Sequence, residues 1–125
     1  MTRPHALISV VDDDESIRES LPELLQLMGF TARPFESAQA FLKSDAVPLT
    51  QCLILDISMP GMSGPQLQRE LKIRKLHIPI IFITAQVDQS LRKTLLAEGA
   101  IDCLIKPFSE QDLRSALDGA LGIRE

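Results

Sequence analysis

The sequence predicts an α/β domain built on a doubly wound parallel sheet with helices on both faces. Short apolar stretches alternate along the chain with segments whose apolar residues recur at helical spacing. Strict alternation of strands and helices favours parallel strands joined by right-handed crossovers. The chain has 125 residues, 45% of them hydrophobic, so we expect a single domain over residues 1–125 with a substantial core.

The five expected strands differ in how deeply they should be buried. They are expected at residues 6–11, 30–35, 52–56, 79–84 and 100–105. The stretch "CLILD" is apolar without interruption up to its acid, which is typical of a strand covered on both faces. The stretch "FTARPF" contains Pro34, which indicates an edge strand. A flavodoxin-like strand order 2-1-3-4-5 places that strand on an edge, as the proline requires.

Five helices separate and follow these strands. They are expected at residues 17–28, 37–42, 64–76, 88–98 and 109–121. Gly29 and Gly99 end the first and the fourth of them. Pro22 lies inside the first helix, where it should bend the helix or cost a hydrogen bond, but the apolar stripe continues beyond it. Pro65 is allowed because it falls in the first turn of its helix.

Charged and hydroxyl side chains gather at the carboxyl ends of the strands, where open α/β sheets bind their ligands. The range Asp12–Asp14 follows the first strand, and Asp56 ends the third. The fourth strand ends on Thr84, and Lys106 follows the fifth. The first, third and fourth strands are neighbours in the expected order, so these acids and the hydroxyl should converge.

Carboxylates packed this closely repel one another and need a cation. An all-oxygen set of ligands favours a hard ion such as Mg²⁺, which pairs with phosphate. Asp56 could then act as a nucleophile toward phosphorus, and Lys106 could neutralise the added charge. Thr84 could donate to a phosphoryl oxygen, and Ser58 could offer its carbonyl to the metal. Glycines and Pro60 shape a tight loop after Asp56 whose backbone could approach the ligand.

Four stretches, "VVDDDES", "LDISMPGMSG", "ITA" and "IKPF", resemble the signature blocks of two-component response-regulator receiver domains of the CheY-like kind. The stretches "MPGMSG" and "ESAQAFL" most resemble the FixJ-type subgroup, whose members often carry a C-terminal helix-turn-helix. The resemblance implies a phosphorylation-controlled switch in a two-component phosphorelay, which accepts a phosphoryl group from a sensor histidine kinase. It implies no enzyme activity beyond the domain's own phosphorylation and dephosphorylation.

The resemblance also assigns roles to individual residues. The implied Mg²⁺ site comprises Asp12, Asp13, Asp56 and the Ser58 carbonyl, with Asp56 as the phosphoacceptor. Within it, Asp13 would bind the ion directly and Asp12 through water. Thr84 matches the switch hydroxyl of the family and Lys106 its phosphate-binding lysine. The bond between Lys106 and Pro107 is cis in the family.

One position departs from the family pattern. Receiver domains usually carry an aromatic residue three positions before the lysine, and its ring turns inward on activation. This chain has Cys103 there. A thiol cannot repeat the movement of a ring, so the usual coupling of Thr84 to the surface is in doubt. We still expect phosphorylation to act through the face formed by residues 88–98, 100–105 and 109–121, which is also a possible homodimer interface.

Composition restricts the other partners and the location. The net charge is −4 and the chain has no run of lysine or arginine, so direct nucleic-acid binding is not expected. No apolar run is long enough for a membrane span and the N-terminus lacks a signal-peptide pattern, which favours the cytoplasm. Cys52 and Cys103 are too few for a disulfide framework and are expected to be small buried hydrophobes that do not pair.

Two other functions share parts of this pattern. The spacing of Asp12 and Asp14 after a buried strand imitates haloacid-dehalogenase-type phosphatases, but no late acidic pair or cap domain is visible and Asp56 would have no role. A nucleotide or flavin binder on the same fold would need a glycine-rich turn after the first strand, where three acids stand instead. Asp14 by itself is best interpreted as a helix cap.

Overall fold

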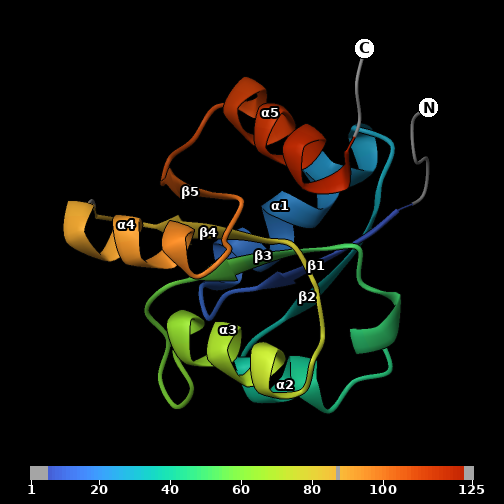
Figure 1. The fold of residues 1–125 in the computed structure, drawn as a ribbon. Coiled ribbons are helices and arrows are strands. Elements are labelled where there is room, and N and C mark those ends of the chain that lie inside the picture. The colour runs from blue at the N-terminus through green and yellow to red at the C-terminus, as the bar shows by residue number, and fades with distance from the viewer. Residues whose placement is uncertain (1–5, 87, 123–125) are drawn as a thin grey trace.

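A computed structural model describes residues 6–86 and 88–122 of the chain (Figure 1). Five strands form one parallel sheet in the order β2-β1-β3-β4-β5, as predicted. The strands are β1 (Leu7–Val11), β2 (Thr31–Phe35), β3 (Cys52–Asp56), β4 (Ile80–Thr84) and β5 (Asp102–Ile105). The helices are α1 (Glu15–Leu27), α2 (Ala38–Leu42), α3 (Gly64–Ile73), α4 (Gln89–Ala97) and α5 (Glu110–Leu121), and a 3₁₀ turn, η1, covers Val47–Leu49.

Helices cover both faces of the sheet, α1 and α5 on one and α2 and α3 on the other (Figure 1). The buried strand β3 supplies both cores in alternation. Cys52 and Ile54 pack with apolar residues of α1 and α5, whereas Leu53 and Leu55 pack with those of α2, α3 and α4. The two-period alternation of a strand therefore explains why the whole of β3 is apolar.

Most element boundaries lie within one residue of the predicted ones; the exceptions are the start of α1 at Glu15, the end of α3 and the start of β5. The helix expected over residues 64–76 ends at Ile73, because Lys75 adopts a left-handed conformation with φ 60° that reverses the chain. Leu76 nevertheless packs on the core from outside the helix. Its apolar side chain continues the helical spacing in the sequence, which is why the predicted helix was too long. The strand expected over residues 100–105 begins at Asp102. The 3₁₀ turn before β3 was not predicted.

Two local predictions are confirmed. Helix α1 continues through Pro22, whose ring is buried, because the apolar stripe on both sides of it packs on the sheet. Cys52 and Cys103 are both buried and free, and β4 lies between their strands. Burial raises the pKa of the Cys52 thiol to about 12 and also raises that of Cys103, which keeps both thiols protonated and unreactive at neutral pH.

No helix in the described part of the chain is both long enough and apolar enough to cross a membrane.

Candidate functional site

The expected convergence of acids at the carboxyl edge of the sheet is confirmed for three residues. Asp12 follows β1 directly and Asp56 ends β3, and these two strands pair in the sheet. Together with Asp13 they can offer one oxygen each so that the three oxygens lie within 4.8 Å of one another. The topology therefore assembles a cluster of carboxylates from positions more than forty residues apart in the chain.

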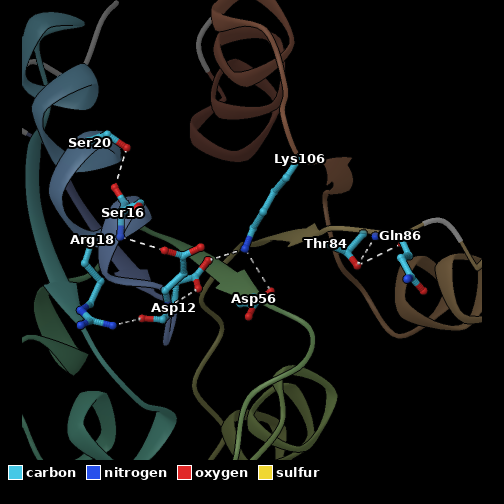
Figure 2. A network of polar contacts seen from close by, with 9 residues as sticks. Asp12, Ser16, Arg18, Ser20, Asp56, Thr84, Gln86 and Lys106 are labelled. Atoms are coloured by element: carbon cyan, nitrogen blue, oxygen red, sulfur yellow. Dashed lines mark hydrogen bonds and ion pairs between the residues drawn. The ribbon is translucent and has the colours of Figure 1, made fainter.

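Asp12 is held in place from several sides. Its side chain is fully buried, and its Oδ1 accepts a hydrogen bond of 2.8 Å from the backbone N–H of Asp14. Its backbone carbonyl accepts a 3.0 Å hydrogen bond from Arg18 Nη1 (Figure 2). Sequence reasoning missed Arg18, which lies six residues further along the chain, at the start of α1. An arginine on the helix after the acidic strand end was the only signal that could have found it.

Asp14 occupies the N-cap position of α1, where its side chain accepts the N–H of Ser16 at 2.8 Å. The interpretation of Asp14 as a helix cap is thus confirmed. Its carboxylate satisfies a free backbone donor of the helix, although the residue also lies on the wall of the acidic pocket.

Lys106 lies between the two buried acids (Figure 2). Its Nζ is 2.9 Å from Asp12 Oδ2 and 3.5 Å from Asp56 Oδ1. Its backbone N–H donates to the carbonyl of Thr84 at 2.7 Å, which fixes the turn after β5 against the end of β4. The Lys106–Pro107 peptide bond is cis, as the resemblance implied. The lysine and the acids thus meet from three different strand ends.

The charges of the site shift two pKa values. Burial and, after it, the negative charge of Asp12 raise the pKa of Asp56 to about 6 against the opposing effect of Lys106. For Lys106, desolvation lowers the pKa of the ammonium, but its contact with Asp12 and the charge of Asp56 outweigh this, so that its pKa lies above the usual value. Lys106 is therefore protonated at neutral pH, whereas Asp56 titrates just below it.

Thr84 and Ser58 lie on the wall of the same pocket, which has a volume of about 500 Å³. The Thr84 hydroxyl does not point at Asp56. It donates to the carbonyl of Gln86 at 3.0 Å and accepts from the N–H of Gln86 at 3.3 Å (Figure 2). The prediction that Thr84 lies in the same pocket as the acids is therefore confirmed. The orientation of its hydroxyl differs from the prediction, because the backbone of Gln86 in the loop after β4 provides nearer hydrogen-bond partners.

The loop after Asp56 is tight for a reason that the sequence did not reveal. A Cβ on Gly64 would collide with the carbonyl oxygen of Asp56 and would lie 3.0 Å from the ring of Phe82. The N–H of Gly64 donates to the carbonyl of Ile57 at 3.0 Å. The glycine thus allows α3 to start directly against the strand that carries Asp56. The close contact that Gly64 permits is therefore with the backbone of Asp56. The sequence had suggested that the glycines of this loop allow its backbone to approach a ligand.

The residues present fit a hard divalent cation. The three clustered carboxylates supply only oxygen donors, which Mg²⁺ prefers. Among the described residues, the one partner of the buried Asp12 Oδ2 is the Lys106 ammonium, 2.9 Å away, which also lies 3.5 Å from Asp56. One ammonium does not balance three carboxylates. A cation together with its water ligands would give this oxygen a further partner and would offset the repulsion among the three acids.

Comparison with known proteins shows which family of sequences the chain resembles. A sequence model of the family described as response regulator receiver domain matches residues 8–118. Nodulation protein W of Bradyrhizobium diazoefficiens is 42% identical over 115 residues, which cover 92% of this chain and 51% of that protein. The chain thus spans about half the length of the curated relatives it matches.

Two solved structures have the same fold. A low-resolution structure of the response regulator StyR superposes with a TM-score of 0.86 at 43% identity, covering 94% of this chain and 59% of that one. The crystal structure of FixJ-N superposes with a TM-score of 0.84 at 33% identity, covering 100% and 98% of the two chains.

Proposed function

Because the chain belongs to the response regulator receiver domain family, we propose that Asp56 is the carboxylate on which it accepts a phosphoryl group. Receiver domains are signalling switches that a kinase phosphorylates on an aspartate. The observation that supports Asp56 above the other acids is its position at the end of the central strand. It is nearly buried, it belongs to the carboxylate cluster, and Lys106 lies 3.5 Å from its Oδ1.

In the proposed step, an oxygen of Asp56 forms a bond to phosphorus while the bond from phosphorus to the donor breaks. The donor is an imidazole nitrogen of a phosphohistidine, or the acyl oxygen of acetyl phosphate in the test tube. The leaving group keeps the electron pair of the broken bond, and the imidazole takes up a proton. The attacking carboxylate must be ionised, and with a pKa of about 6 Asp56 is mostly ionised at pH 7.

The surrounding residues position and neutralise the group that is transferred. Lys106 offsets the negative charge added at Asp56. The Thr84 hydroxyl must leave Gln86 before it can donate to a phosphoryl oxygen. The carboxylates and the Ser58 carbonyl would hold a magnesium ion. When bound, the ion supplies positive charge that reduces the repulsion between the phosphoryl group and the acids of the site. By the resemblance to the family, Asp13 would bind the ion directly and Asp12 would bind it through water.

The proposed reaction is stoichiometric: each chain takes one phosphoryl group and later loses it to water. A phosphatase built on the same acids would instead release many phosphates per chain. We do not favour that function here, because the Asp14 carboxylate, which such an enzyme would use as its acid, is engaged as the cap of α1.

The partners follow from the same proposal. The donor is a cognate sensor histidine kinase, and since such a kinase is recharged from ATP, the reaction belongs in the cytoplasm. Residues 1–125 act as one receiver domain that makes no direct contact with nucleic acid. The face formed by α4, β5 and α5 is the proposed surface for a second copy of the chain or for the output partner.

Intact mass after incubation with Mg²⁺ and acetyl phosphate tests the proposal. We expect one acid-stable, base-labile phosphoryl adduct per chain, absent from the Asp56→Asn variant and from samples containing EDTA. Asp14→Asn is the matched control, since it removes a carboxylate from the same pocket without touching the phosphoacceptor. An unchanged adduct on Asp56→Asn would refute the assignment.

A further inference from the structure

At Cys103, on the outer edge of the sheet, side chains form hydrogen bonds with the backbone groups that a neighbouring strand would otherwise bind. Strand β5 is the last strand of the sheet, so one of its backbone edges has no neighbouring strand within residues 6–86 and 88–122. At Cys103 the backbone N–H donates to Asp102 Oδ1 at 2.7 Å, and the backbone carbonyl accepts from Arg92 Nη1 at 3.0 Å. Arg92 Nη2 also lies 3.5 Å from Asp102 Oδ1. We call this set of contacts among Arg92, Asp102 and Cys103 the Arg92 bridge.

The Arg92 bridge joins the first turns of α4 to β5. Arg92 is the fourth residue of the helix, and its backbone N–H donates to the carbonyl of the N-cap residue Asp88 at 2.9 Å. Of the α4 residues, all of which the structure describes, only Leu95 is fully buried. The other long polar contacts of the helix, from Gln68 to the Leu95 carbonyl and from Lys72 to Glu98, lie nearer its C-terminal end. The N-terminal half of α4 thus depends on Arg92 for its polar attachment to the sheet.

A small cavity connects the Arg92 bridge with the phosphoacceptor site. It has a volume of about 30 Å³, and Thr84, Gln86, Arg92 and Cys103 all lie on its wall. A space of this size holds one or two waters and is far too small for an aromatic ring. Cys103, which occupies the usual aromatic position, therefore lines a gap that it does not fill, and Arg92 lines the same gap.

Movement of the Thr84 hydroxyl toward Asp56 would change the position of Arg92 through the loop between β4 and α4. The Thr84 hydroxyl is bonded to both backbone groups of Gln86, which would have to shift when the hydroxyl turns away. Asp88, two residues later, caps α4 through its side chain and bonds to the backbone of Arg92. A shift at Gln86 therefore reaches the helix turn that presents the guanidinium to β5.

We infer that Arg92 is the positioning residue that links the phosphorylation state of Asp56 to the outer edge of β5, in place of the ring that this chain lacks. The inference rests on the proposed phosphorylation of Asp56. In the unmodified protein the Arg92 bridge holds α4 against Cys103; phosphorylation draws Thr84 away from Gln86 and loosens the bridge. The backbone groups of Cys103 then become available to a partner of the α4–β5–α5 face.

Coupling of this kind is reciprocal. If phosphorylation weakens the bridge, then removing the bridge should favour phosphorylation. The Arg92–Asp102 pair is half-exposed, at 38% and 35% of the side-chain surface, so the expected effect is modest. We expect the apparent affinity for beryllofluoride in the presence of Mg²⁺ to rise roughly fivefold in Arg92→Met, a factor at the lower end of typical couplings between sites. The Mg²⁺ affinity should not change, because Arg92 is not part of the carboxylate cluster.

Hydrogen exchange followed by mass spectrometry tests the inference on the whole chain, with and without Mg²⁺ and beryllofluoride. In Arg92→Met, peptides that cover α4 and β5 should exchange without beryllofluoride as fast as those of the treated wild type, and treatment should add little. Arg92→Lys keeps one donor for the Cys103 carbonyl and should fall between the two. Arg114→Met is the matched control: Arg114 lies 3.7 Å from Glu110 on α5, and its loss should leave hydrogen exchange and beryllofluoride affinity as in the wild type.

The outcomes separate this inference from the proposed function. A wild type that gains no adduct on Asp56 would overturn both. A wild type that is phosphorylated normally, with an Arg92→Met variant that exchanges hydrogen and binds beryllofluoride like it, would overturn the role of Arg92 alone. Faster exchange throughout the sheet of Arg92→Met would also overturn it, because the residue would then only stabilise the fold.

Discussion

Lys106 Nζ lies closer to Asp12 Oδ2, at 2.9 Å, than to the proposed phosphoacceptor, at 3.5 Å. The closest contact of the lysine is therefore with the acid that follows the neighbouring strand β1. Asp12 is fully buried and already fixed by the N–H of Asp14, whereas Asp13 is exposed. This difference between adjacent acids leads to different predictions for their substitution.

Replacing Asp13 should affect Mg²⁺ binding more than replacing Asp12. Asp13→Asn removes a proposed direct ligand and should abolish measurable binding in calorimetry. Asp12→Asn removes a proposed contact through water and should lower the affinity roughly 10- to 100-fold, as is usual for outer-shell partners. Because the metal-free acids repel one another, Asp13→Asn should also raise the midpoint of thermal unfolding in EDTA. Equal loss of binding in the two variants would contradict this ranking.

The stability of the metal-free protein should fall as Asp56 ionises. Its pKa is raised from 3.8 to about 6, first by burial. A carboxyl whose pKa is higher in the folded than in the unfolded state stabilises the fold while protonated. That contribution is complete below pH 3.8 and is lost as the pH rises through about 6. Over this range the wild type should lose at most ~3 kcal/mol relative to Asp56→Asn.

Urea unfolding in EDTA at several pH values measures this difference. Comparison with Asp56→Asn cancels the titration of the other acids, which both proteins share. Parallel stability curves for the two proteins would mean that Asp56 titrates normally.

Gly64→Ala should destabilise the protein although alanine is the better helix former. Alanine in place of glycine inside a helix usually gains about 1 kcal/mol. At Gly64, however, the new Cβ would collide with the backbone carbonyl of Asp56, which cannot move without displacing β3. Overpacking typically costs about 1–3 kcal/mol, so we expect a net loss and slower phosphorylation of Asp56.

Gly119→Ala on α5 is the matched control, because its Cβ would meet only Ile101 Cγ2 at an ordinary 3.7 Å. This variant should be as stable as the wild type or more stable in urea unfolding. If Gly64→Ala gained stability as well, the close approach of α3 to Asp56 would not constrain the site.

Activation should depend on Thr84 and not on the thiol of Cys103. Beryllofluoride should promote self-association or partner binding through the α4–β5–α5 face, which sedimentation of treated and untreated protein measures. Cys103→Ser should leave this response intact, since the side chain is buried among apolar residues beside a small cavity and makes none of the contacts with Arg92 and Asp102, which come from the backbone of Cys103. Thr84→Ala should lose the response. The reverse result would make the thiol the switch.

The sequence by itself determined the fold and the membership of the site. Uninterrupted apolar strands and amphipathic helices admit one parallel arrangement with Pro34 on an edge, and the sheet order is as predicted. Because parallel strands end at one edge, the same pattern brought Asp12, Asp13 and Asp56 together. These features depend on periodicity and on strand order, both of which can be read along the chain.

Only the tertiary structure decided the directions of side chains and the contacts between distant segments. The Thr84 hydroxyl faces Gln86, and α3 begins against the carbonyl of Asp56, for which Gly64 is required. Arg92 reaches the backbone of Cys103, eleven residues away, although neither residue shows by its type that it has this partner. Such contacts depend on rotamers and on distances of a few ångströms between packed elements. A residue pattern records which face a side chain occupies, but not which atom it meets there.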